Sequence, residues 1–145
     1  MTNIPSKIVY TASATTTGGR QGHAVSSDGV LDLQLTAPKE MGGPGTGTNP
    51  EQLFAAGYSA CFNGALMMVA KAAKVDASAA QVTVNVGFGP EGDSYAITGD
   101  IEVAIPGLEL AQVQELAEGA HQVCPYSKAT RGNVPVTVKA VAAAA

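Results

Sequence analysis

Residues 53–70, from Leu53 to Ala70, contain no charged side chain, and Cys61 lies near their middle. A segment of this length could form a marginal membrane span. It is rich in Ala and Gly, however, contains Ser59 and Asn63, and lies between segments with the alternating pattern of amphipathic strands. We therefore expect a central helix of a protein core, buried on most of its sides, and no membrane partner.

The residues that flank this segment predict where the helix begins and ends. Thr48 and Glu51 fit a capping box, and Pro50 suits the first turn of a helix. Lys71 and Lys74 lie near the predicted end, where cations interact favourably with the helix dipole.

The rest of the chain predicts short strands and a second helix. Strands are predicted over 7–15, 22–27, 30–35, 81–88, 95–105 and 134–141, and an amphipathic helix over 109–121 with Leu110, Val113, Leu116 and Ala117 on one face. Asp28-Gly29 predicts a hairpin with a type I′ turn, and residues 89–93 predict a longer link between two antiparallel strands. Strands with two principal helices and no regular βαβ alternation indicate an α+β fold with a mainly antiparallel sheet, in one domain over residues 1–145.

The composition favours self-association. Charged residues make up 14% of the chain, against about 25% in an average soluble protein. A monomer with so few charges would leave much apolar surface in water, so we expect a twofold homodimer. The net charge of −4 and the lack of a basic run argue against nucleic acid and anionic membranes as partners. Residues 1–16 lack the pattern of a secretory signal, and we expect a cytoplasmic protein.

Cys61 and Cys124 are the only cysteines of the sequence. A lone helical cysteine is most often a packing residue, and an apolar helix raises the pKa of its thiol. Pro125 follows Cys124, and a short segment then ends at Gly132, so Cys124 is predicted to cap a short helix whose amides favour a thiolate. On these local grounds Cys124 would be the more acidic thiol. A permanent disulfide is not expected in the cytoplasm, so the pair points to catalysis, redox chemistry or metal binding.

Three further side chains have to be weighed against simpler interpretations. Arg20 lies in the glycine-flanked turn GGRQGH, where a solvated loop arginine is the simplest interpretation. His23 and His121 could join the cysteines in a zinc site, but only His121 and Cys124 are close in sequence. Zinc sites usually contain two such close pairs, so we expect no metal, and no motif for another cofactor is present.

Two long motifs carry a family resemblance. The segments TNPEQLFAAGYSACF (residues 48–62) and VCPYSKATRGN (residues 123–133) resemble the organic hydroperoxide resistance (Ohr) branch of the OsmC/Ohr family. The resemblance runs from Lys7 to the last predicted strand, and the Val-Cys-Pro-Tyr-Ser stretch separates this branch from its OsmC relatives. Lys128 stands where the family leads us to expect Asn, a departure at the surface. The resemblance implies an OsmC/Ohr-like intertwined homodimer with active sites at the subunit interface.

The resemblance also implies a chemistry and assigns roles in it. Cys61 corresponds to the peroxidatic cysteine and Cys124 to the resolving one, linked through a Cys61 sulfenic acid and a Cys61–Cys124 disulfide. Arg20 corresponds to the cation that activates Cys61, and Glu51 to the carboxylate that holds Arg20. The implied substrates are organic and lipid hydroperoxides. The implied reductant is dihydrolipoamide or a lipoylated protein, with no cofactor, and these roles reverse the local preference for Cys124.

Apolar side chains close to Cys61 in sequence predict a substrate pocket. They are Phe54, Tyr58, Phe62, Leu66 and Met67. Such a pocket would favour bulky apolar hydroperoxides over hydrogen peroxide, since each buried methylene contributes roughly 0.8 kcal/mol.

Two questions stay open at this point. On one continuous helix, Glu51 and Cys61 would lie about 15 Å apart along the axis and roughly 80° apart around it. Either the helix breaks near Gly57, or Arg20 and Glu51 meet Cys61 across a dimer interface. The competing functions are a general OsmC-type peroxidase and a non-enzymatic redox sensor or hydrophobic-ligand module, which would stop after one oxidation per chain.

Overall fold

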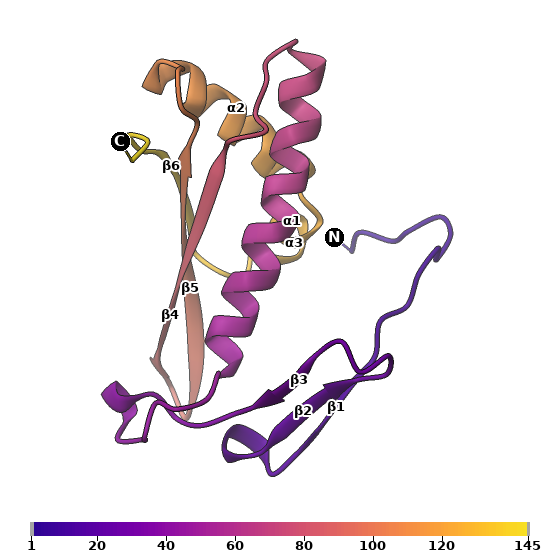
Figure 1. Ribbon diagram of the computed structural model, residues 1–145, viewed down its shortest axis with the longest axis vertical. Helices are drawn as coiled ribbons and strands as arrows, with labels where there is room; N and C mark the ends of the chain where they lie inside the picture. Colours follow the sequence, from indigo (N-terminus) through magenta and orange to yellow (C-terminus); the bar gives the residue numbers. More distant parts are fainter. Residues whose placement is uncertain (1, 145) are drawn as a thin grey trace. The chain divides into compact units, whose positions relative to one another are not determined.

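The computed structural model describes residues 2–144, and its helices and strands form an α+β fold, as predicted (Figure 1). The chain divides into two compact units, Met1–Leu53 and Phe54–Ala145. The single domain predicted over residues 1–145 stays a prediction.

The first unit contains a three-stranded antiparallel sheet in the order β1-β2-β3. Its strands are β1 (Ala14–Thr17), β2 (His23–Ser26) and β3 (Asp32–Gln34). The 3₁₀ helix η1 (Gly19–Gln21) joins β1 to β2 and carries Arg20, and η2 (Lys39–Met41) follows β3. The strand predicted over 7–15 is wrong for most of its length, because regular pairing starts only at Ala14. Residues 7–13 contain the β-branched and aromatic residues typical of strands but have no paired strand in the described chain, and a strand exists only by pairing.

The hairpin between β2 and β3 is confirmed, but its predicted turn type is wrong. The Gly29 N–H donates to the Ser26 carbonyl at 2.9 Å. Gly29 has a φ of 75°, whereas Asp28 stays outside the positive-φ region that a type I′ turn requires of both central residues. The reason lies in the Asp28 carboxylate, which accepts hydrogen bonds from the Ser26 hydroxyl at 2.6 Å and the Val30 N–H at 3.0 Å. These local bonds hold a different turn.

The long helix α1 (Pro50–Ala72) begins at Asn49 as its cap, so the predicted capping box is wrong. The Asn49 Oδ1 accepts the Gln52 N–H at 2.8 Å, and Pro50 occupies the first helical position. Thr48 instead donates through its hydroxyl to the Gln52 side chain. Asn is as good a cap as Thr or better, and its use leaves the Glu51 carboxylate available for another partner.

The second unit is built on a three-stranded sheet with the order β4-β5-β6. β4 (Gln81–Glu91) and β5 (Ser94–Ala104) pair antiparallel from Gln81↔Ala104 to Glu91↔Ser94, and β6 (Val136–Ala140) pairs parallel with β5. Most of the link predicted over 89–93 therefore belongs to strands, which leaves a two-residue turn.

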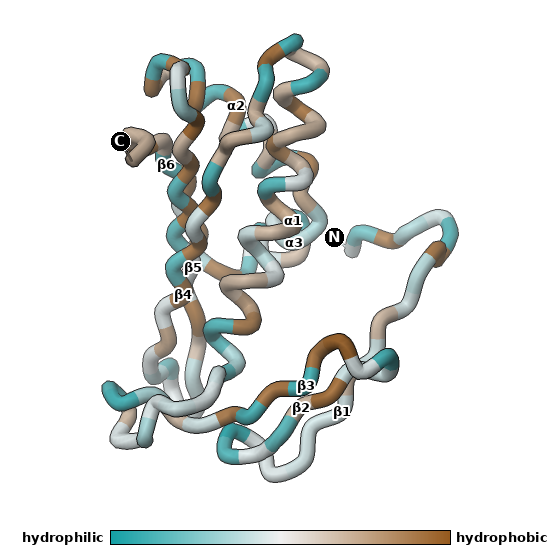
Figure 2. The backbone as a smooth tube through the Cα atoms, viewed as in Figure 1, coloured by the Kyte–Doolittle hydropathy of each residue, from teal (hydrophilic) through white to brown (hydrophobic). Residues whose placement is uncertain are grey.

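One face of this sheet is apolar. Hydrophobic and hydrophilic residues alternate along β4 and β6 (Figure 2). The apolar positions are in register across the sheet, namely Val82, Val84, Val86, Gly99, Ile101, Val103, Val136, Val138 and Ala140. Helices α1 and α2 (Leu110–Val123) pack against this face, because their buried side chains form one cluster with it. The short α3 (Pro125–Thr130) follows α2.

Only one face of α1 is buried in the protomer, so the expectation of burial on most sides is wrong. Tyr58, Phe62 and Leu66 are inaccessible, whereas Met67 and Met68 are 49% and 59% exposed. The helix is long and apolar enough to span a membrane, a property it shares with core helices of soluble proteins. On α2, Val113, Leu116 and Ala117 are buried as predicted. Leu110 is 53% exposed, because it stands at the first position of the helix.

Candidate active site

The two cysteines, 63 residues apart in sequence, lie side by side in the second unit. Cys124 Sγ lies 3.6 Å from Cys61 Sγ, and both thiols are free. Cys61 is partly buried on α1, and Cys124 is inaccessible to solvent. A disulfide bond is about 2.05 Å long, so the formation of a disulfide between these two thiols would require only a small further approach of the sulfurs.

Cys124 occupies the corner between two helices. It is the C-cap of α2 and the N-cap of α3, with Pro125 at the first position of α3, so the predicted cap of a short helix is confirmed. Its N–H donates to the Ala120 carbonyl at 2.8 Å, and its carbonyl accepts the Lys128 N–H at 2.9 Å. The backbone on both sides of this cysteine is therefore held by helical hydrogen bonds.

Burial raises the pKa of the Cys61 thiol. A hydrogen bond from the Tyr126 backbone N–H favours the thiolate and opposes this effect, while the adjacent Cys124 raises the pKa further. The Tyr126 N–H lies in the first turn of α3, so the corner that carries Cys124 also delivers a donor to Cys61. In this environment Cys61 needs additional positive potential to ionise at neutral pH.

A buried polar cluster lies beside the cysteines. The Tyr58 hydroxyl lies 2.9 Å from Ser127 Oγ and 3.1 Å from Thr130 Oγ1, and His121 Nδ1 lies 2.7 Å from Ser127 Oγ. Burial, and secondarily the charge of Arg131, lower the pKa of His121, which favours the neutral ring. These contacts connect α1, α2 and α3.

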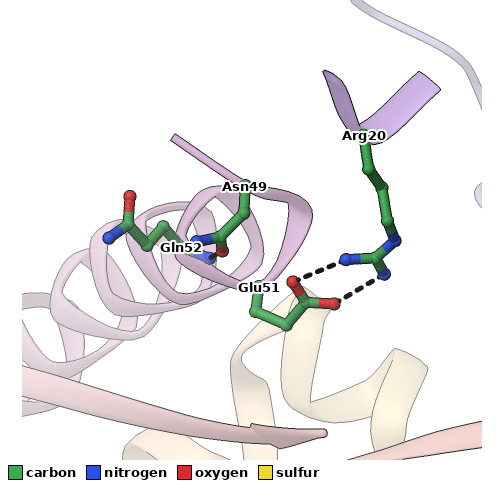
Figure 3. A network of polar contacts seen from close by, with 4 residues as sticks. All are labelled: Arg20, Asn49, Glu51 and Gln52. Atoms are coloured by element: carbon green, nitrogen blue, oxygen red, sulfur yellow. Dashed lines mark hydrogen bonds and ion pairs between the residues drawn. The ribbon is translucent and has the colours of Figure 1, made fainter. Parts of the chain in front are cut away.

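The first unit contains an ion pair between Arg20 and Glu51 (Figure 3). Arg20 Nη1 and Nη2 donate to the two Glu51 oxygens at 3.0 and 2.7 Å, a bidentate pair between η1 and the first turn of α1. The hydrogen bonds from Arg20 lower the pKa of Glu51, and those to Glu51 raise the pKa of Arg20. The interpretation of Glu51 as a capping partner is therefore wrong, whereas Arg20 lies at the surface, with a side chain that is 43% exposed, and is held there in an ion pair.

Helix α1 is continuous from Pro50 to Ala72 and passes through Gly57 without a break. The alternative of a break near Gly57 is wrong. Glu51 and Cys61 thus lie on one helix, about 15 Å apart along its axis.

The five predicted pocket residues lie in different surroundings in the protomer, and their role as a pocket stays a prediction. The side chains of Tyr58, Phe62 and Leu66 are fully buried, and Met67 is half-exposed on another side of α1. Phe54 lines a cavity of about 860 Å³ in the second unit. The other lining residues are Glu91, Tyr95, Ala96, Ile97, Tyr126, Ala129, Thr130, Asn133, Val134 and Pro135.

Tyr126 connects this cavity to the thiols. Its ring lines the cavity and lies 6.1 Å from the Phe54 ring and 5.6 Å from the Tyr58 ring, while its backbone N–H points to Cys61. Tyr126 and Ser127 were not predicted from the sequence, although both belong to the motif around Cys124, and His121 was considered only as a metal ligand. The position of His121 one helical turn before Cys124 was the sequence feature that could have placed it beside the thiols.

Comparisons with known proteins identify relatives along nearly the whole chain. Residues 43–139 match the family model described as OsmC-like protein. The organic hydroperoxide resistance protein of Xanthomonas axonopodis pv. citri is 52% identical over 136 residues, covering 92% of this chain and 96% of that protein. Two solved structures of organic hydroperoxide resistance proteins are also similar. The Elizabethkingia anophelis protein has a TM-score of 0.86, with 46% identity over 94% of this chain and 99% of that chain. OhrB of Bacillus subtilis has a TM-score of 0.84, with 44% identity over 92% of this chain and 100% of that chain.

Proposed function

The chain belongs to the OsmC-like protein family, and we propose that it is a cysteine-based peroxidase that reduces organic hydroperoxides to alcohols. The observation that carries the proposal is the 3.6 Å separation of two free thiols that are 63 residues apart in sequence. The relatives named for organic hydroperoxide resistance support the choice of substrate class.

The first step uses Cys61 as the nucleophile, because it is the more accessible of the two thiols. The Cys61 thiolate attacks the outer oxygen of ROOH, the S–O bond forms, and the O–O bond breaks. The leaving RO⁻ takes up a proton to give ROH, and Cys61 becomes a sulfenic acid. Peroxide is reduced by two electrons, and the sulfur is oxidised by two.

The second step uses Cys124. Its thiol condenses with the Cys61 sulfenic acid, which forms the Cys61–Cys124 disulfide and releases water. A dithiol of the lipoyl type then reduces the disulfide by thiol–disulfide exchange and leaves as its own cyclic disulfide. We place this cycle in the cytoplasm, where such dithiols stay reduced.

Arg20, oriented by Glu51, supplies the positive potential that Cys61 needs, and it does so across a homodimer interface. The support is the bidentate pair between them, together with the axial distance of about 15 Å between Glu51 and Cys61 on one helix. The guanidinium stabilises the thiolate and the charge that develops on the leaving oxygen, and Glu51 fixes its orientation.

The exposed apolar side chains support the homodimer. Ile8, Val9 and Tyr10 precede the first strand and are 66%, 88% and 77% exposed, and Val30 is 81% exposed. A three-stranded sheet with so little buried apolar surface of its own gains stability by burying these side chains against another layer. A second copy is the commonest solution for a chain with few charges.

The cavity beside Tyr126 supports a substrate with an apolar organic group. Phe54, Ile97 and Tyr126 are among its lining residues, and each methylene buried there contributes roughly 0.8 kcal/mol. We expect kcat/KM for cumene hydroperoxide to exceed that for hydrogen peroxide by well over tenfold, since more than two methylene equivalents enter the cavity. Equal values for the two peroxides would contradict the assignment of the cavity.

Two variants test the division of labour between the cysteines. Cys61→Ser should abolish turnover of cumene hydroperoxide with dihydrolipoamide. Cys124→Ser should consume about one equivalent of peroxide to form the Cys61 sulfenic acid, and a second equivalent only where this is oxidised further to the sulfinic acid, and then stop, because the sulfenic acid has no thiol to condense with. Its mass spectrum should show one or two added oxygen atoms on Cys61 accordingly. Oxygen added to Cys124 of the Cys61→Ser protein, with none added to Cys61 of the Cys124→Ser protein, would reverse the roles. A wild-type protein that stops after one oxidation per chain, despite excess dithiol, would be a redox sensor and not a peroxidase.

A further inference from the structure

Three helices meet in a chain of hydrogen bonds that the reaction above does not use. Tyr58 comes from α1, His121 from α2, and Ser127 and Thr130 from α3. Tyr58, Ser127 and Thr130 are 0%, 0% and 3% exposed, so water cannot replace a missing partner. A buried hydroxyl without a partner destabilises a protein, so each of these groups has to find its partner within the cluster.

Each hydroxyl has one proton, and this assigns every donor in the cluster. Thr130 Oγ1 donates to the Ser127 carbonyl at 3.2 Å, since a carbonyl oxygen only accepts. Thr130 therefore accepts from the Tyr58 hydroxyl, and Tyr58 accepts from Ser127 Oγ. Ser127 has then used its proton and accepts from His121 Nδ1. Only this assignment satisfies all four contacts, and it requires a proton on Nδ1 of His121.

Members of the cluster stand one helical turn away from each cysteine along the helices. Tyr58 lies one turn before Cys61 on α1. His121 lies one turn before Cys124, and Ser127 lies one turn after it. The bond between His121 and Ser127 therefore spans the corner that carries Cys124, and the bond between Ser127 and Tyr58 ties that corner to α1 beside Cys61. Arg131 adds a second connection across the corner by donating to the His121 carbonyl at 2.5 Å.

We propose that His121 and Ser127 are positioning residues that hold Cys124 against Cys61. Their role is to make disulfide formation faster than further oxidation of the Cys61 sulfenic acid. This inference rests on the proposed function. Two reactions compete for that intermediate. Condensation with the Cys124 thiol gives the disulfide and water, whereas a second ROOH gives the sulfinic acid and ROH. The first is intramolecular, so its rate depends on the placement of Cys124, and a misplacement of about 1 Å can slow it by about a hundredfold.

The test measures this competition directly. Reduced protein receives increasing cumene hydroperoxide without a dithiol, and mass spectrometry gives the ratio of sulfinic acid on Cys61 to the Cys61–Cys124 disulfide. Ser127→Ala should raise that ratio by about tenfold to a hundredfold at a given peroxide concentration. The rate at which the first equivalent of peroxide is consumed should stay near that of the wild type, because Cys61 itself is unchanged.

Two histidine variants separate hydrogen bonding from other roles of His121. Asn can place an amide N–H where Nδ1 lies, so His121→Asn should keep a ratio close to that of the wild type, whereas His121→Ala should behave like Ser127→Ala. Nitrogen-15 NMR of the wild type should show mainly the Nδ1-protonated form of His121. In Ser127→Ala this form should no longer predominate. An Nε2-protonated ring in the wild type would overturn the assigned direction of the hydrogen bonds.

A matched control distinguishes positioning from loss of stability. Val113 is 1% exposed on α2 and takes no part in the four contacts, so Val113→Ala weakens the same core without touching the cluster. If Ser127→Ala and His121→Ala give the same ratio as Val113→Ala, the positioning role is wrong while the peroxidase proposal stands. If the wild type itself forms no Cys61–Cys124 disulfide with peroxide, the proposed function fails, and this inference fails with it.

Discussion

Burial and reactivity act in opposite directions on Cys61. A thiol reacts with peroxide as its thiolate, and burial raises the pKa of Cys61. The Tyr126 N–H compensates in part, but a single amide is a weak substitute for a full charge. The bidentate pair of Arg20 and Glu51 holds a guanidinium in one orientation, which suits it to a water-poor site.

The pH dependence of Cys61 alkylation tests whether Arg20 is that charge. The experiment uses the Cys124→Ser background, in which iodoacetamide reports on Cys61 alone, and the rate follows the thiolate fraction. Removing a cation disfavours the thiolate, so Arg20→Ala should move the midpoint of the rate profile to higher pH. Glu51→Ala should move it in the same direction by a smaller amount, because the guanidinium remains but loses its orientation. An identical midpoint in Arg20→Ala would remove Arg20 from the site.

The sequence predicts single residues well where the cause is local. Pro125 after Cys124 predicts the helix cap, and the cap is present. The Glu51 capping box fails because Asn49, one residue away from the predicted cap, competes for the same amides. The contact of His121 with Ser127 escapes a sequence pattern because it spans a corner between helices, and only the geometry of that corner brings the two side chains together.

At the scale of elements, alternation predicts strands but not their neighbours. β4 and β5 follow from their alternating residues and their connecting turn. The parallel pairing of β6 with β5 is not contained in the residues of β6, since it depends on where α2 and α3 return the chain. The same limit explains residues 7–13, whose pattern is that of a strand although the described chain offers them no partner. For α1, apolar composition indicates burial but not how many faces the protomer itself covers.

Two glycines of α1 offer a matched pair of substitutions. A Cβ at Gly57 would lie 2.8 Å from the Tyr126 hydroxyl oxygen, whereas a Cβ at Gly64 has no atom within 4 Å. Ala in place of Gly stabilises a helix by roughly 0.8–1.0 kcal/mol. Gly64→Ala should therefore stabilise the protein by about that amount in urea unfolding. Gly57→Ala should destabilise it by about 1–3 kcal/mol, because Tyr126 must move.

The two substitutions, Gly57→Ala and Gly64→Ala, should also have different effects on kcat/KM. Tyr126 carries the amide that faces Cys61 and a ring that lines the cavity, so Gly57→Ala should lower kcat/KM while Gly64→Ala leaves it unchanged. Stabilisation by both substitutions, with full activity in both, would mean that the close approach of Tyr126 to α1 has no functional consequence.

At the scale of the whole molecule, the proposed activity requires two chains. Cys61 and Cys124 come together within one unit of one chain, and Arg20 and Glu51 come together within the other. The continuous helix α1 keeps Glu51 and Cys61 about 15 Å apart along its axis. The thiol pair is therefore formed within one unit and the ion pair within the other. In a homodimer, the guanidinium of one chain can then act on the thiols of the other chain.

Mixed dimers of two inactive variants test this arrangement. Arg20→Ala keeps both cysteines, and Cys61→Ser keeps Arg20, so neither homodimer has a complete site. If the site forms across the interface, a mixed dimer contains one complete site, in which Arg20 of the Cys61→Ser chain faces Cys61 of the Arg20→Ala chain. Random pairing should then restore about a quarter of the wild-type activity with cumene hydroperoxide and dihydrolipoamide.

Mixing Cys61→Ser with Cys124→Ser is the control and should restore none, because both thiols of a site belong to one chain. No recovery in the first mixture, with mixed dimers demonstrated by differential tagging, would mean that Arg20 acts on the Cys61 of its own chain or not at all.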